Sequence, residues 1–325
     1  MEDVREMDIQ NVKKIYDEVR NEVKKVIIEQ DKMIEYAIIS FFCGGHILIE
    51  GVPGLGKTLF IKALTDSMNM SSNRIQFTPD MMPADVVGTK IYNMQSQTFE
   101  LRKGPIFANL ILADEINRTP PKTQAGLLEA MQEESVSIDG VTMELPQPFM
   151  VMATQNPIEF EGTYSLPEAL IDRFLFKIQI DYPSLGGEVE LLKRMNDIHT
   201  RKLDSKNCGV QSVCREADIL AVRNTISEIK LETSLYNYIV EIVRATRNHK
   251  VIEIGSSPRG GIAIMNAAKA YAAIQGREFV LPEDIKEVAI PALNHRIILI
   301  PEAELEGIRV QNVLTEILNT VKVPR

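Results

Sequence analysis

One short stretch constrains this chain more than any other feature. Residues 51–58 read Gly-Val-Pro-Gly-Leu-Gly-Lys-Thr, which matches the G-x-x-x-x-G-K-[ST] pattern of a phosphate-binding loop. The apolar run at residues 46–49 predicts a buried strand before the loop, and residues 59–64 predict a helix after it. This context favours a true phosphate-binding loop over an accidental glycine-rich turn, and predicts that the chain binds a nucleoside triphosphate.

The chemistry of such a loop explains its residue types. Glycines let successive backbone N–H groups turn toward one anion, and the start of the following helix adds the positive end of its dipole. Lys57 would neutralise the β- and γ-phosphates, and the Thr58 hydroxyl would ligate Mg²⁺. We therefore expect ATP and Mg²⁺ as cofactors, with nucleotide contacts from Gly51, Val52, Pro53, Gly54, Leu55, Gly56, Lys57, Thr58 and Leu59.

Two carboxylates follow a second apolar run. Asp114 and Glu115 come directly after residues 110–113, and the carboxyl end of a strand is where α/β proteins bind ligands. Asp114 can hold Mg²⁺ through water, and Glu115 can take a proton from the attacking water. The alternative is that the two carboxylates only solvate a strand end. With a phosphate-binding loop in the same chain, the pair predicts ATP hydrolysis.

The order of predicted elements indicates an α/β fold followed by a helical part. Predicted strands at residues 46–49, 74–77, 109–113, 149–153 and 174–180 alternate with helices, which favours a mostly parallel sheet flanked by helices. Amphipathic helices are then predicted at residues 187–200, 215–229, 232–248, 259–274, 282–294 and 308–321. We place the boundary near Pro183, between a nucleotide-binding core with its N-terminal helix at residues 1–182 and an all-helical lid at residues 183–325.

Composition narrows the setting of the protein. The net charge is −9, from 36 basic and 45 acidic residues, so nucleic acid is not an expected partner. Cys43, Cys208 and Cys214 make no disulfide framework, which favours a reducing compartment. No apolar run approaches the roughly 18 residues of a membrane span, and residues 1–6 lack the basic start of a signal peptide. We expect a cytoplasmic protein without a membrane span.

Longer motifs carry a more specific resemblance. They are the stretches at residues 45–58, 74–80, 114–118, 121–124, 153–157 and 161–169. Together they resemble the MoxR family of AAA+ ATPases, and the resemblance covers the whole chain. It implies a P-loop AAA+ core with a C-terminal lid, ATP hydrolysis, and assembly of the chain with itself into a ring, most often a hexamer.

The resemblance also assigns three residues that the motifs above leave out. Asn156 matches sensor 1, whose amide would orient the lytic water; a turn-forming Asn before proline is the alternative. Arg173 matches the arginine finger that a neighbouring subunit supplies; a surface pair with Asp172 is the alternative. Arg259 matches sensor 2 at the start of a lid helix, in contact with nucleotide in its own subunit or the next. A solvated arginine near a helix cap is its alternative.

These assignments complete the predicted site. The predicted catalytic residues are Lys57, Glu115, Asn156 and Arg173. The predicted metal ligands are Thr58 and Asp114, and Arg259 is a predicted nucleotide contact.

Two predicted hairpins interrupt the core, at residues 91–101 and 135–145. The resemblance presents them as moving parts, whereas ordinary surface hairpins are the alternative. It also implies a chaperone-like role, in which the ring remodels or matures a protein client, with von Willebrand factor A-type proteins as frequent partners.

Three other functions compete with this interpretation. A nucleic-acid-dependent AAA+ motor needs basic or aromatic side chains on its hairpins, and the tips at residues 93–97 and 137–140 have neither. A magnesium-chelatase-like motor subunit would share the general architecture. A non-catalytic assembly subunit would use ATP only to hold its structure together. The presence of every expected catalytic residue disfavours this function: Lys57, Asp114, Glu115, Asn156 and Arg173.

Overall fold

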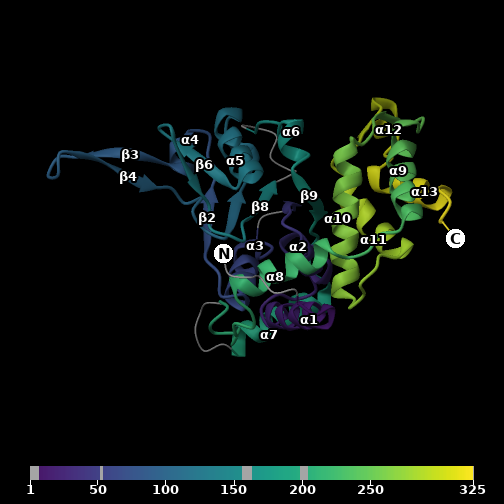
Figure 1. Ribbon diagram of the computed structural model, residues 1–325, viewed down its shortest axis with the longest axis horizontal. Coiled ribbons are helices and arrows are strands. Elements are labelled where there is room, and N and C mark those ends of the chain that lie inside the picture. Colours follow the sequence, from purple (N-terminus) through teal and green to yellow (C-terminus); the bar gives the residue numbers. More distant parts are fainter. Residues whose placement is uncertain (1–6, 52–53, 156–162, 198–203, 325) are drawn as a thin grey trace.

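The centre of the molecule is a five-stranded parallel sheet (Figure 1). The computed structural model describes residues 7–51, 54–155, 163–197 and 204–324. In spatial order the strands are β2 (Ser72–Gln76), β5 (Leu110–Asp114), β8 (Met150–Gln155), β1 (His46–Glu50) and β9 (Phe174–Gln179). Every pair of neighbours is parallel. The predicted α/β class is confirmed.

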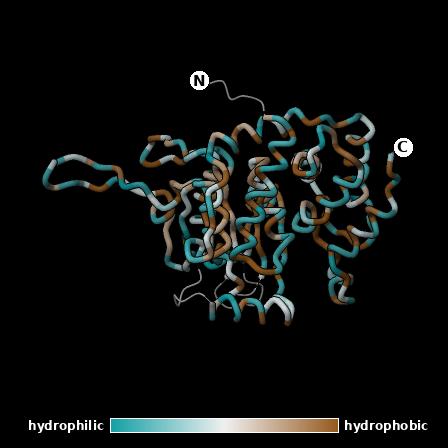
Figure 2. Tube along the Cα trace, turned by 90° about the horizontal axis from the view of Figure 1, so that it is seen from below, coloured by the Kyte–Doolittle hydropathy of each residue, from teal (hydrophilic) through white to brown (hydrophobic). Residues whose placement is uncertain are grey.

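Helices cover both faces of this sheet, which explains why its strands are apolar without interruption. Side chains alternate between faces along β1, so that Ile47 and Ile49 pack on one side and Leu48 on the other. Hydrophobic residues accordingly fill the interior between the layers (Figure 2). One face holds α1 (Ile9–Lys24), α2 (Asp31–Phe42) and α3 (Lys57–Ser67). The other holds α4 (Pro83–Val87), the 3-10 helix η1 (Ile116–Arg118), α5 (Pro121–Glu133) and α6 (Glu168–Ile171).

Both predicted hairpins are present. One consists of β3 (Gly88–Asn93) and β4 (Thr98–Lys103), and it extends far from the body of the molecule (Figure 1). The other consists of β6 (Ser135–Ile138) and β7 (Val141–Glu144). The longer hairpin carries an aromatic pair directly below its tip, Tyr92 and Phe99, whose ring centroids lie 5.3 Å apart. The prediction from the tips overlooked this pair, because the two residues meet only through the strand register.

The C-terminal part is helical, as predicted. Its helices are α7 (Leu185–Asp197), α8 (Glu216–Ser227), α9 (Thr233–Arg247), α10 (Pro258–Ile274), α11 (Pro282–Leu293), α12 (Pro301–Leu305) and α13 (Val310–Thr320). A short antiparallel ladder of β10 (Ile252–Ile254) and β11 (Ile298–Leu299) lies among them. Among the described residues, no helix combines the length and the apolar character needed to cross a bilayer.

The helices that follow the sheet do not all gather in the lid. The Arg223 guanidinium of α8 donates to the Phe41 carbonyl of α2 at 3.1 Å. The Ser184 hydroxyl, just before α7, donates to Glu29 at 2.8 Å. Helix α8 therefore contacts α2, and the residue before α7 contacts the segment between α1 and α2. The boundary near Pro183 stays a prediction.

His46 connects three elements at the start of β1. Its Nδ1 accepts the backbone N–H of Val151 in β8 at 3.1 Å, so Nε2 carries the proton and lies 3.0 Å from the Met131 carbonyl of α5. Burial lowers the pKa of His46 from 6.5 to about 4, because the charged imidazolium would lose its hydration inside the protein. The folded protein therefore keeps this imidazole neutral under conditions where the unfolded chain protonates it.

This difference predicts acid sensitivity. Below pH 6.5 the unfolded state binds more protons than the folded state, so stability falls as the pH falls from 6.5 toward 4. We expect His46 alone to lower the free energy of unfolding by about 3 kcal/mol across that window. Denaturant unfolding of wild type and His46→Gln at pH 7 and pH 4.5 checks this. The variant is expected to be less stable at pH 7 but to lose less on acidification. An equal loss of unfolding free energy in the two proteins on acidification would contradict the prediction. Such a loss would come from groups that both proteins share, such as His295, whose pKa is also lowered by burial.

Candidate active site

The phosphate-binding loop lies between β1 and α3. Gly54 and Gly56 have φ of +89° and +75°, a left-handed conformation that side-chain-bearing residues rarely adopt. Gly51 packs against the end of β9, where an added Cβ would lie 2.9 Å from the Ile180 carbonyl oxygen. These conformations turn the chain sharply into α3, whose first residue is Lys57. A hollow of about 390 Å³ lies over the loop, lined by Gly51, Gly54, Leu55, Gly56, Lys57, Thr58, Leu59, Arg74, Asp114, Glu115 and Thr154.

Lys57 lies inside this hollow, half-buried. Its Nζ donates to the Gly51 carbonyl at 2.8 Å, which holds the ammonium group at the mouth of the loop. Partial burial lowers the pKa of Lys57, while the nearby Asp114 and Glu115 carboxylates act in the opposite direction. A triphosphate would supply the anionic partner that this ammonium group has only at longer range.

Asp114 ends β5 and is held on both carboxylate oxygens. The Thr154 hydroxyl, from the neighbouring strand β8, donates to Oδ1 at 2.6 Å. Arg74, from β2 on the other side, donates to Oδ2 from Nη2 at 2.6 Å and from Nε at 3.1 Å. Because parallel register places all three strand ends at one edge of the sheet, the carboxylate is fixed by residues distant in sequence.

Glu115 is aimed by the backbone as well as by its partners. Its φ of 57° is left-handed, and its N–H donates to the Thr154 hydroxyl at 2.9 Å. The carboxylate oxygen Oε2 accepts the Gln76 side-chain amide at 2.9 Å and Arg118 Nη1 at 3.0 Å. Two donors thus fix the direction of the Glu115 side chain, and a carboxylate is a group that can accept a proton from water.

The oxygen donors in the hollow fit Mg²⁺. This ion takes oxygen ligands and keeps several waters, so beside a triphosphate it needs only one or two protein groups. The Thr58 hydroxyl and the Asp114 carboxylate line the same hollow. Asp114 Oδ1 accepts one hydrogen bond, from Thr154, and therefore keeps a lone pair for a metal ion, whereas Oδ2 already accepts two from Arg74. Thr58 and Asp114 would hold the ion, which would neutralise phosphate charge.

Arg173 and Arg259 both lie at the amino-terminal ends of the strands, whereas the phosphate-binding loop follows the carboxyl end of β1. Arg173 directly precedes β9, whose first residue Phe174 pairs with His46 at the start of β1. Its Nη2 donates to Gln132 at 2.6 Å. Arg259, in the first turn of α10, lies 3.2 Å from the carboxylate of Asp172, next to Arg173.

A buried arginine fixes this joint between core and lid. Arg296 Nε donates to Asp172 Oδ1 at 2.8 Å, and its Nη2 donates to the Phe174 carbonyl at 2.9 Å. Asp172 therefore bridges Arg296 and Arg259. The salt bridge considered from sequence, between Arg173 and Asp172, is replaced by these lid contacts of Asp172.

Three predicted residues cannot be placed. Val52 and Pro53 of the loop and Asn156, the predicted sensor 1, lie outside the described residues. Sequence reasoning in turn gave no role to Arg74, Gln76, Thr154 and Arg118. A sequence signal existed for two of them. Arg74 and Gln76 are two positions apart in β2, the edge strand that borders β5, so their polar side chains share one face of the sheet.

These features define a P-loop ATPase of the AAA+ class. A family model for the ATPase family associated with various cellular activities (AAA) matches residues 46–176. A second model, for the AAA lid domain, matches residues 244–317.

Similar proteins narrow the class. YeaC of Bacillus subtilis is 45% identical over 302 residues, covering 93% of this chain and 92% of YeaC. Chaperone MoxR1 of Mycobacterium tuberculosis is 40% identical over 313 residues, 94% of this chain and 81% of that protein. A crystal structure of a candidate ATPase from Cytophaga hutchinsonii aligns with a TM-score of 0.90 at 44% identity, over 98% of this chain and 97% of that chain. The chain belongs to the MoxR family of AAA+ ATPases, and it is an ATP-hydrolysing enzyme.

Proposed function

We propose that this protein hydrolyses Mg-ATP at sites formed between two copies of the chain. The copies assemble into a closed ring, a hexamer. One observation carries the proposal. The two arginines expected at the γ-phosphate lie at the amino-terminal ends of the strands, whereas the phosphate-binding loop lies at the carboxyl ends. Residues 173 and 180 lie at opposite ends of β9, about 20 Å apart along the strand. An arginine side chain does not span that distance.

The arrangement supports a division of labour between copies. One copy binds the triphosphate through its loop, Lys57 and Thr58, and positions water with Glu115. The next copy supplies Arg173, and Arg259 beside it, to stabilise the charge that develops on the transferring phosphoryl group. The contact of Arg259 with Asp172 favours action in the neighbouring site over action in its own. Asn156 remains the candidate for orienting the water.

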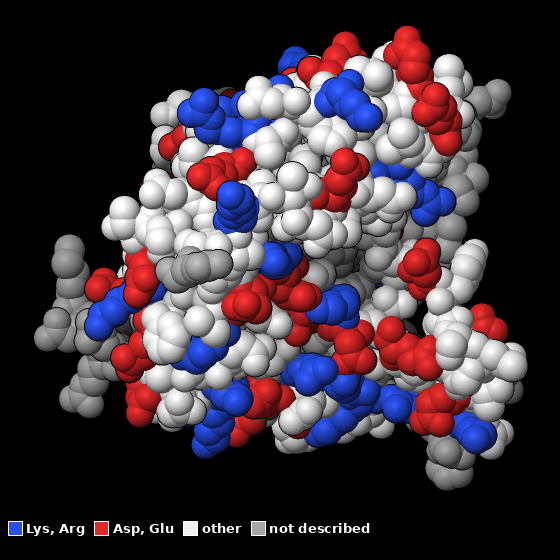
Figure 3. Space-filling model, turned by 90° about the vertical axis from the view of Figure 1, so that its right-hand side faces the viewer, with Lys and Arg blue, Asp and Glu red and all other residues white. Residues whose placement is uncertain are grey.

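We further propose that the ring applies the energy of hydrolysis to a protein client. The name of the relative MoxR1, a chaperone, supports this. So does the protruding hairpin, whose Phe99 is 71% exposed, since exposed apolar side chains suit a polypeptide partner. On the face shown in Figure 3, basic and acidic side chains are interspersed, which does not favour tracking of nucleic acid. A von Willebrand factor A-type protein is a candidate partner.

A cytoplasmic location belongs to the same proposal. Cys43, Cys208 and Cys214 are free thiols, and burial raises the pKa of Cys43 and of Cys214 to about 12. Such thiols are inert and suit a reducing compartment.

A shared site predicts that turnover depends on protein concentration. We expect ATP turnover per chain to fall by at least about tenfold on dilution below the assembly range, because separated copies lose the arginines. Steady-state phosphate release across a dilution series, with sedimentation of the same samples, checks this. Lys57→Ala is the control, and it should lose ATP binding at every concentration. Constant turnover per chain in samples shown to be monomeric would contradict a shared site.

A further inference from the structure

Helix α7 presents its apolar side outward. Leu185, Val189 and Leu192, which we call the α7 stripe, recur at the i, i+4, i+7 spacing of one helix face. Leu185 is 81% exposed and Leu192 is 70% exposed. A surface helix of a monomeric protein normally turns such a stripe inward, so this face calls for a partner.

The inward side of α7 is polar. Arg194 donates from Nε to Glu190 at 3.0 Å and from Nη1 to the Lys25 carbonyl, at the end of α1, at 2.9 Å. At the other end of the helix, the Gly187 N–H donates to the Ser184 hydroxyl, which in turn donates to Glu29. Polar contacts thus anchor α7 on its own core and leave the α7 stripe uncovered.

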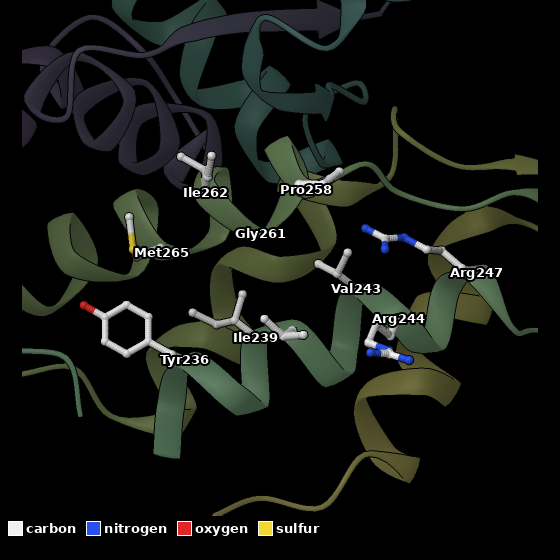
Figure 4. Close-up of a pocket in the computed structure, with 10 residues that line it drawn as sticks. Tyr236, Ile239, Val243, Arg244, Arg247, Pro258, Gly261, Ile262 and Met265 are labelled. Carbon is white, nitrogen blue, oxygen red and sulfur yellow. The ribbon is translucent and has the colours of Figure 1, made fainter. Parts of the chain in front are cut away.

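A complementary hollow lies in the lid between α9 and α10 (Figure 4). This lid groove has a volume of about 370 Å³ and is lined by Tyr236, Ile239, Val240, Val243, Arg244, Arg247, Pro258, Gly261, Ile262 and Met265. Its walls are mostly apolar, and Ile262 is 54% exposed. Arg244 and Arg247 lie at one end, and Tyr236 and Met265 lie toward the other (Figure 4).

We propose that the α7 stripe of one copy packs into the lid groove of the next copy. The inference rests on the proposed function, because the same contact must carry arginines to a neighbouring nucleotide. Pro258 of the groove is adjacent in sequence to Arg259, so the groove begins beside the arginines. Helix α7 follows the end of β9, where Ile180 touches Gly51 of the phosphate-binding loop. A copy that brings its arginines to the next phosphate-binding loop therefore brings its groove toward the next α7.

The chemistry of the two surfaces also matches. A helix that binds in a groove uses apolar anchors at i, i+4 and i+7, which is the spacing of the α7 stripe. Glu188 and Lys193 flank the stripe on its two sides, and the acidic edge can face Arg244 and Arg247. We favour a second copy of this chain, rather than an unrelated helix, as the occupant of the lid groove. Both surfaces belong to this chain, and the groove lies beside Arg259 whereas α7 follows the strand end near the phosphate-binding loop.

Two single substitutions test the contact, one on each surface. Leu192→Glu and Ile262→Glu each place a charge in the proposed interface, and both side chains are exposed, so the fold should survive. We expect each to raise the concentration needed for half-assembly by at least about 30-fold, the size of an interface hot spot. Sedimentation measures assembly, and thermal unfolding confirms the fold. Leu305→Glu, at a leucine that is 88% exposed on α12, is the matched control and should assemble normally.

Mixing the two variants tests the direction of the contact. The Leu192→Glu copy retains its groove and arginines, and the Ile262→Glu copy retains its α7 and nucleotide site. The mixture should regain part of the ATP turnover that each variant lacks alone. Adding Lys57→Ala to the Ile262→Glu copy should abolish the recovery, whereas adding it to the Leu192→Glu copy should leave it intact.

Three results would overturn the inference. They are normal assembly of either variant, a mixture that stays inactive although both variants are folded, and sensitivity to Lys57→Ala in the opposite copy. Ile262→Glu rings that assemble but lose a client would assign the groove to that client instead. Sedimentation measures assembly independently of ATP turnover. Rings that assemble but never hydrolyse ATP would therefore refute the proposed function and leave the proposed contact standing.

Discussion

Replacing Arg173 with alanine is expected to lower ATP turnover by about 10³-fold or more while changing ATP affinity by less than about threefold. The reason is position: Arg173 lies beyond the far end of β9 from its own phosphate-binding loop, so in the proposed shared site it would contribute only where a neighbour binds ATP. The charge it stabilises exists in the transition state and not in the bound ground state. Single-turnover phosphate release and fluorescent-nucleotide binding, on the same sample, separate the two quantities.

A mixture supplies the control for action between copies. Arg173→Ala keeps its nucleotide site, and Lys57→Ala keeps its arginine. Random rings of the two variants in equal amounts should recover roughly one quarter of wild-type turnover, because that fraction of neighbours combines an intact site with an intact arginine. A mixture that stays inactive while sedimenting as rings, or equal loss of binding and turnover in Arg173→Ala, would count against this assignment.

Replacing Glu115 with glutamine is expected to slow hydrolysis by about 10²- to 10⁴-fold, the range for loss of a general base. The amide keeps the size of the carboxylate and one acceptor oxygen for the Gln76 and Arg118 donors, which lie at 2.9 and 3.0 Å in the wild type. ATP binding through the loop and Lys57 should be retained. Pre-steady-state phosphate release measures the chemical step directly. An unchanged rate of that step would remove Glu115 from the reaction.

The slow variant also provides a search for the client. A ring that holds ATP without hydrolysing it should retain a partner protein during purification from its own cells. The double variant Lys57→Ala/Glu115→Gln, which cannot bind ATP, should not retain the same partner. A protein recovered equally with both variants would be a bystander of the purification.

The phosphate-binding loop and the two carboxylates could be predicted from sequence, because each is specified by a short stretch of residues. The glycine pattern at residues 51–58 specifies a loop between a strand and a helix, and Asp114 and Glu115 end an apolar run. That they meet follows from a rule: parallel strands share one carboxyl edge. The sheet and the helical lid were predicted for the same reason, since hydrophobic periodicity is a short-range property.

The partners of these carboxylates could not be predicted in the same way. Arg74 and Thr154 reach Asp114 from strands on either side of β5, and no sequence pattern states which strands are neighbours. The arginines show the same limit more strongly. Sequence left open which nucleotide Arg259 contacts. Only the structure shows its contact with Asp172, which lies 87 positions earlier in the chain, and that contact supports the proposal that Arg259 acts in a neighbouring site.

The sequence by itself determined the chemistry of this protein: a phosphate-binding loop, two carboxylates at a strand end and a helical lid, within the MoxR family. Only the tertiary structure decided the geometry between these parts. It set Arg173 and Arg259 at the edge of the sheet away from their own loop, and it turned the α7 stripe outward although the periodicity of α7 is that of a packed helix. The physical reason is that periodicity specifies which residues share a face, whereas the packing of the lid on β9 and of α7 on α1 depends on contacts between residues far apart in the chain.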